Sequence, residues 1–180
     1  MTLASLLTFS RIFFIIPIIF FCSQSDLSYI LFGLAMYIFA SLTDFLDGYI
    51  ARKTNTVSQI GALYDLLADK IFVASILIWL VYYYGEFLLF LPAVLIVCRE
   101  IVISSLRQYS AQHGMPRLEV NISGKLKTTV QMVSIGFLLV GHINEKLYLI
   151  GIGLIWMATF LSCLSLFSYI KKLLSEKEKL

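Results

Sequence analysis

Six long apolar segments, separated by short polar stretches, dominate this 180-residue sequence. An α-helix needs roughly 20 mostly apolar residues to cross the hydrocarbon core of a bilayer. The chain is 59% hydrophobic and only 14% charged, and one soluble domain of this length could not bury so much apolar surface. The sequence therefore predicts an all-α integral membrane protein with six transmembrane helices, over residues 3–22, 28–50, 58–83, 87–109, 126–143 and 147–171.

The chain is expected to form one domain. We assign residues 1–171 to a six-helix membrane domain and residues 172–180 to a polar cytoplasmic tail. The first apolar segment has no basic residue before Arg11 and no small-residue cleavage site, so it is interpreted as a retained helix and not as a signal peptide. The net charge of +3 is too small to indicate a nucleic-acid partner.

Lysine and arginine are distributed unevenly among the connections. The connections after the second and fourth segments, together with the C-terminal tail, hold most of them, whereas the alternate connections hold only Lys146. Cytoplasmic connections of membrane proteins carry the excess of positive charge. The pattern predicts a multi-pass protein of the cell inner (cytoplasmic) membrane, with both termini in the cytoplasm and an even number of spans.

Four aspartates gather where the second segment ends and the third begins. Asp44 and Asp47 are three residues apart, and Asp65 and Asp69 are four apart, so each pair lies on one face of its helix. Four carboxylates at close range need positive charge between them. Oxygen ligands favour Mg²⁺ or Mn²⁺, and four aspartates could hold two such ions.

A simpler interpretation is that these aspartates cap helices or pair with nearby cations such as Arg52 and Lys70. Capping does not explain Asp69, which lies more than two turns inside its helix, or an acidic pair near a helix C-terminus. Gly48 and Gly61 share the faces of the aspartates. Small residues there allow either close helix packing or the approach of a ligand, and beside the carboxylates we favour a ligand.

The segment from Asp44 to Asp69 resembles the signature of the CDP-alcohol phosphotransferase (CDP-alcohol phosphatidyltransferase) family. That signature is DxxDGxxARx8GxxxDxxxD, and every fixed position is matched at the correct spacing. The resemblance implies a six-helix membrane enzyme, usually a homodimer, with its active site facing the cytoplasm. It implies that the four aspartates bind two divalent ions, which hold the pyrophosphate of a CDP-linked lipid, and that Asp69 is also the general base. The positions implied to line the nucleotide site are Gly48, Ala51, Arg52 and Gly61.

Cations in the fourth and fifth segments indicate the acceptor. Arg99 lies about 12 Å from the inner end of its helix, by the rise of an α-helix. A cation at that depth is a functional candidate, although it could instead pair with Glu100 or with the aspartates. Arg107, Lys125 and Lys127 lie nearer the interface, where they bind either lipid headgroups or a substrate phosphate. Several convergent cations suit an acceptor that carries a phosphate, such as glycerol 3-phosphate.

The wider pattern resembles one branch of the family, the phosphatidylglycerophosphate synthases. The resemblance rests on residues 99–107, on residues 124–128 with Gln131, and on the start Leu6-Leu7-Thr8, and it implies that Thr8 contributes to the CDP-lipid site. One position departs from the branch, because Ser5 stands where members commonly have Asn.

The sequence thus predicts transfer of the phosphatidyl group from CDP-diacylglycerol to sn-glycerol 3-phosphate, giving phosphatidylglycerophosphate and CMP. Another acceptor within the family (inositol phosphate, serine or phosphatidylglycerol) is the first alternative. A divalent-cation transporter is the alternative from another class, although transporters commonly place such carboxylates near the bilayer midplane.

Overall fold

The computed structural model describes the backbone of residues 3–54, 59–112 and 122–177, and the side chains of residues 11–43, 66–112, 126–173 and 175. The described residues form six helices. They are α1 (Leu3–Cys22), α2 (Leu27–Thr54), α3 (Gln59–Tyr84), α4 (Phe87–Gln112), α5 (Ile122–Leu139) and α6 (Glu145–Lys177). All six expected helices are present, and most of their ends agree with the expected ones to within a few residues.

The position of α5 differs from the expected one. The apolar pattern placed this helix at residues 126–143, but it begins at Ile122 and ends at Leu139. Residues 140–143 form a tight turn in which the Gly141 N–H donates to the Leu138 carbonyl at 3.2 Å. A Cβ at Gly141 would lie 3.1 Å from the Tyr148 backbone, so glycine permits the close approach of α6. The expected helix ran through Gly141 and His142, although both residues interrupt the apolar run.

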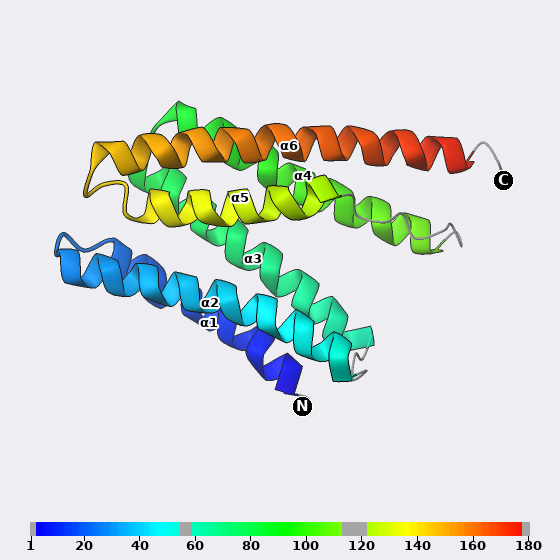
Figure 1. The fold of residues 1–180 in the computed structure, drawn as a ribbon, viewed down its shortest axis with the longest axis horizontal. Helices are drawn as coiled ribbons and strands as arrows, with labels where there is room; N and C mark the ends of the chain where they lie inside the picture. The colour runs from blue at the N-terminus through cyan, green and yellow to red at the C-terminus, as the bar shows by residue number, and fades with distance from the viewer. Residues whose placement is uncertain (1–2, 55–58, 113–121, 178–180) are drawn as a thin grey trace.

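The helices form two antiparallel pairs with α3 between them (Figure 1). On one side, α1 packs along α3, and α2 packs along α1. On the other side, α5 and α6 pack together, and α4 lies against both α6 and α3. The chain direction alternates from helix to helix. As a result, the last turns of α2, α4 and α6 point toward the same end of the bundle.

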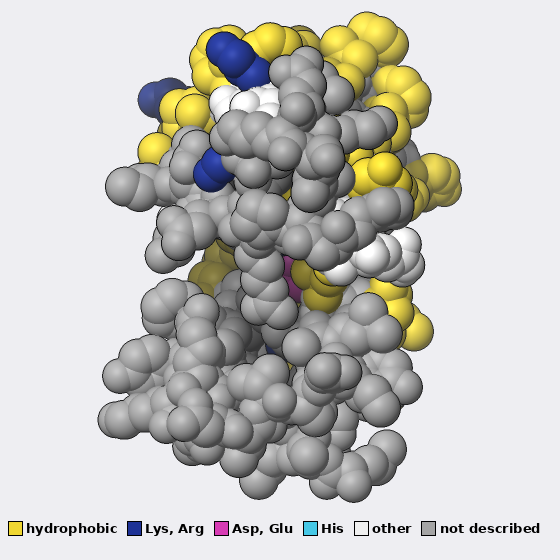
Figure 2. Space-filling view, turned by 90° about the vertical axis from the view of Figure 1, so that its right-hand side faces the viewer, with side chains coloured by type: hydrophobic (Ala, Val, Ile, Leu, Met, Phe, Trp, Pro, Cys, Tyr) yellow, Lys and Arg dark blue, Asp and Glu magenta, His cyan; other side chains and the backbone are white. Residues whose placement is uncertain are grey.

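The bundle has an apolar interior and an apolar exterior. Ile18, Ile76 and Leu138 are fully buried in its core, whereas Phe13 is 77% exposed and Phe167 is 71% exposed. Figure 2 shows hydrophobic side chains over much of the described surface. Exposed apolar surface of this extent indicates a lipid surrounding. Within the described residues, three segments are long and apolar enough to cross a membrane: Leu66–Tyr84, Phe87–Gln112 and Glu145–Leu173.

Polar side chains join neighbouring helices through main-chain carbonyls. The Tyr84 hydroxyl donates to the Leu138 carbonyl at 2.7 Å, and the Trp156 indole N–H donates to the Leu88 carbonyl at 3.1 Å. On the interface of α5 with α6, the Ser134 hydroxyl donates to the Gly151 carbonyl at 2.8 Å. Such bonds satisfy polar groups that have no access to water in a bilayer.

The Gly151 contact leads to a stability prediction. A Cβ at Gly151 would lie 2.8 Å from Leu138 Cγ and 3.2 Å from the Leu138 nitrogen, so Gly151→Ala should force α5 and α6 apart. We expect the free energy of unfolding to fall by about 1–3 kcal/mol, the usual cost of overpacking. Thermal unfolding in detergent micelles measures the change. Gly153→Ala is the matched control on the same helix, because a Cβ at Gly153 meets nothing within 4 Å. Equal stability of the two variants would contradict the prediction.

Candidate active site

The acidic motif lies on two packed helices. Helix α2 continues without a break through Asp44 and Asp47, and α3 contains Asp65 and Asp69 one turn apart. The Tyr37 ring of α2 stacks on the Phe72 ring of α3, with ring centres 5.8 Å apart. In Figure 1 the end of α2 and the start of α3 lie beside each other at one end of the bundle.

Many of the residues predicted for the site have side chains outside the described part of the structure. Their roles therefore stay predictions. These residues are Thr8, Asp44, Asp47, Gly48, Ala51, Arg52, Gly61, Asp65 and Lys125.

Asp69 lies on the wall of a cavity of about 210 Å³ between α3, α4 and α5. The cavity brings Asp69, from the donor half of the predicted site, together with Lys127, from the acceptor half. Its polar lining consists of Asp69, Lys70, Glu100, Lys127, Thr128 and Gln131.

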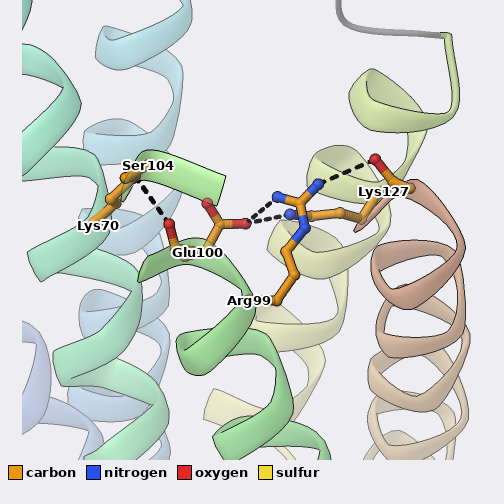
Figure 3. A network of polar contacts seen from close by, with 6 residues as sticks. Lys70, Arg99, Glu100, Ser104 and Lys127 are labelled. Atoms are coloured by element: carbon orange, nitrogen blue, oxygen red, sulfur yellow. Dashed lines mark hydrogen bonds and ion pairs between the residues drawn. The ribbon is translucent and has the colours of Figure 1, made fainter. Parts of the chain in front are cut away.

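Glu100 is the centre of a polar network beside this cavity (Figure 3). Its Oε1 atom accepts hydrogen bonds from Arg99 Nη1, at 2.9 Å, and from Lys127 Nζ. Its main-chain carbonyl accepts from Lys70 Nζ at 3.2 Å and from the Ser104 hydroxyl at 2.9 Å. One glutamate therefore contacts cations from α3, α4 and α5.

The predicted acceptor cations occupy different environments. Lys127 is 3% exposed and lines the cavity. Arg99 is 8% exposed but is not part of the cavity wall, because its guanidinium bonds to Glu100 and, through Nη2, to the Ser165 hydroxyl at 3.1 Å. Arg107 is exposed on α4 and is also absent from the wall. The pairing of Arg99 with Glu100, which the sequence left open, is present, and the contact of Arg99 with a phosphate stays a prediction.

Sequence reasoning gave no functional role to three residues of the wall: Lys70, Glu100 and Gln131. Lys70 was considered only as a partner for the aspartates, and Glu100 only as a partner for Arg99. A signal was available, since a carboxylate inside an apolar helix needs a cationic partner. It did not indicate which cation, because Lys127 is 27 residues away along the chain.

The donor set fits a divalent cation. Asp69 contributes a partly exposed carboxylate to the cavity, and the other motif positions are also carboxylates, which Mg²⁺ and Mn²⁺ prefer. Among the side chains that the structure describes, no group of three or more His, Cys, Asp or Glu residues could hold an ion. The side chains of three of the four motif aspartates lie outside the part of the chain that the structure describes.

Residues 1–164 match the family model of the CDP-alcohol phosphatidyltransferases. The chain therefore belongs to this family of membrane transferases of phospholipid synthesis, which generally depend on a divalent metal.

Similar bacterial proteins bear the name CDP-diacylglycerol–glycerol-3-phosphate 3-phosphatidyltransferase. The protein of Wigglesworthia glossinidia brevipalpis is 37% identical over 158 residues, which cover 87% of this chain and 84% of the relative. The protein of Haemophilus influenzae is 36% identical, with 76% and 74% covered. That of Rickettsia typhi is 35% identical, with 94% and 95% covered.

The buried arginine leads to a second stability prediction. Arg99→Met leaves Glu100 and Ser165 without one donor, so we expect the free energy of unfolding to fall by about 1–3 kcal/mol. Arg107→Met, on the exposed surface of the same helix, is the control and should change it by less than about 0.5 kcal/mol. Thermal unfolding in micelles compares the two, and a larger loss for Arg107→Met would contradict the prediction.

Proposed function

We propose that this protein transfers the phosphatidyl group of CDP-diacylglycerol to sn-glycerol 3-phosphate, forming phosphatidylglycerophosphate and releasing CMP. The observation that carries the proposal is the cavity that has Asp69 and the buried cation Lys127 on its wall. A carboxylate suits the hydroxyl of the acceptor, and a cation suits its phosphate. The names of the bacterial relatives support the same pair of substrates.

In this reaction Asp69 accepts the proton of the C1 hydroxyl of glycerol 3-phosphate. The oxygen attacks the phosphorus bonded to diacylglycerol, the bond from that phosphorus to the bridging oxygen breaks, and CMP leaves. Phosphoryl transfer of this kind depends on charge neutralisation and positioning more than on covalent chemistry. Asp44, Asp47, Asp65 and Asp69 would hold two divalent cations, Mg²⁺ or Mn²⁺, which supply the positive charge that the pyrophosphate needs.

The remaining roles divide between the two substrates. The proposed contacts to the CDP-lipid are Thr8, Gly48, Ala51, Arg52 and Gly61. The proposed holders of the acceptor phosphate are Arg99, Arg107, Lys125 and Lys127. Support from the structure is most direct for Lys127, which borders the cavity beside Lys70.

We further propose that all six helices cross the bacterial inner membrane as residues 1–171, with residues 172–180 as the tail. Both termini and the active site would face the cytoplasm, and the protein would be a homodimer. The alternating helix direction and the apolar outer faces support the membrane arrangement. In this arrangement the acyl chains of the CDP-diacylglycerol stay in the bilayer during transfer.

An acceptor screen tests the proposal. Purified protein is incubated with CDP-diacylglycerol, Mg²⁺ or Mn²⁺, and one alcohol at a time, and CMP release is measured. We expect glycerol 3-phosphate to support faster release than inositol phosphate, serine or phosphatidylglycerol, and EDTA to stop the reaction. Faster release with another alcohol would overturn the acceptor, and metal flux into liposomes without CMP release with any alcohol would favour a transporter.

The proposed base gives a further prediction. Asp69→Asn keeps the size of the side chain but cannot accept the proton, so kcat should fall by at least about a hundredfold. Asp26→Asn is the matched control, because the exposed Asp26 side chain lies before α2, where it accepts a hydrogen bond from the Ser28 N–H. CMP release at saturating substrate measures both variants. Full turnover by Asp69→Asn would exclude Asp69 as the base.

A further inference from the structure

We propose that Glu100 is a positioning residue for the acceptor. In this inference, which rests on the function proposed above, the Glu100 carboxylate keeps Lys127 charged and directed toward the phosphate of glycerol 3-phosphate. Arg99 also acts on this pair through Glu100, because it bonds to the same carboxylate oxygen as Lys127.

The contacts of Lys127 support this role. Its ammonium group is almost fully buried, pairs with Glu100 Oε1, and borders the same cavity as Asp69. An ammonium has three N–H donors. With one directed to Glu100, two are left for a phosphate, and the ion pair fixes the direction in which they point. A phosphate bound there would leave the hydroxyl end of the acceptor on the side of Asp69.

The charge balance explains why Glu100 is needed. Lys70, Arg99 and Lys127 all contact Glu100, and the last two are buried. Buried like charges repel one another strongly, and a buried ammonium without a counter-ion loses its proton or turns toward water. Because one Glu100 oxygen accepts hydrogen bonds from both Arg99 and Lys127 (Figure 3), removal of its charge would weaken the cation that the phosphate requires.

The other contacts of Glu100 hold it in place. Its main-chain carbonyl accepts from Lys70 Nζ of α3, and Arg99, bonded to the same carboxylate, is fixed to Ser165 of α6. The backbone of Glu100 is thereby held from α3 and its carboxylate, through Arg99, from α6, so Glu100 cannot easily follow a displaced Lys127. In this arrangement Arg99 acts on the cavity through Glu100, although it does not line the cavity.

The test separates the two Michaelis constants. Glu100→Gln keeps the shape of the side chain but loses its charge, so KM for glycerol 3-phosphate should rise about tenfold or more, while KM for CDP-diacylglycerol changes by less than about twofold. Glu100→Asp keeps the charge and should recover part of the loss. Glu86→Gln is the matched control, since Glu86 accepts a hydrogen bond from the Tyr148 hydroxyl away from the cavity. An unchanged or lower KM for glycerol 3-phosphate, or an equal rise of both constants, would overturn the proposal.

A double substitution covers the case in which Glu100→Gln does not fold. Lys127→Gln combined with Glu100→Gln removes both charges of the ion pair. Neither residue is then left as a buried charge without its partner. If Glu100 acts through Lys127, KM for glycerol 3-phosphate in the double variant should match that of Lys127→Gln within about twofold. A further rise of about fivefold or more would show an independent role and overturn the inference.

The unsubstituted protein in the same assay keeps the two proposals distinguishable. If it releases no CMP with glycerol 3-phosphate, the proposed function fails and the inference fails with it. If it does release CMP and Glu100→Gln behaves like Glu86→Gln, only the inference fails.

Discussion

The buried ion pair between Glu100 and Lys127 is the interaction on which the rest of the candidate site depends. In water, either charge could be solvated in many positions. Inside an apolar bundle each charged group needs a partner of opposite charge from the chain itself. A buried charge without such a partner destabilises the fold strongly. The ion pair links α4 to α5 through two long side chains. Lys70 and Arg99 link the same glutamate to α3 and α6. The same contacts define one side of the cavity that contains Asp69.

Much of the fold could be predicted because the bilayer simplifies the problem. Apolar length alone located the six helices, and the spacing of Asp65 and Asp69 placed both on one face of α3. Two features were beyond these rules. Helix α5 ends at Leu139, before the polar residues His142 and Asn144 that marked the expected break. Helix α6 continues to Lys177, past the expected end of the membrane domain at residue 171. Turn geometry and helix ends depend on local packing, which a hydropathy pattern does not describe.

Individual residues of the candidate site were proposed from the sequence, but the contacts between them could not be predicted. Asp69 and Lys127 were both identified from sequence, and the structure places them on one cavity. The central position of Glu100 was not foreseen, because it follows from how α3, α4 and α5 pack. Arg99 illustrates the same limit. Its position within an apolar segment made it a candidate, but only the packing shows that its guanidinium bonds to Glu100 and Ser165.

The length of α6 has a consequence for where the bundle sits in its surroundings. Its 33 residues extend about 50 Å, whereas the hydrocarbon core of a bilayer is about 30 Å thick. In the membrane arrangement proposed above, a helix of this length extends beyond the hydrocarbon core or tilts within it. Lys171 and Lys172 are both exposed in its last turns. At the C-terminal end of the helix, these two positive charges would lie within reach of anionic lipid headgroups.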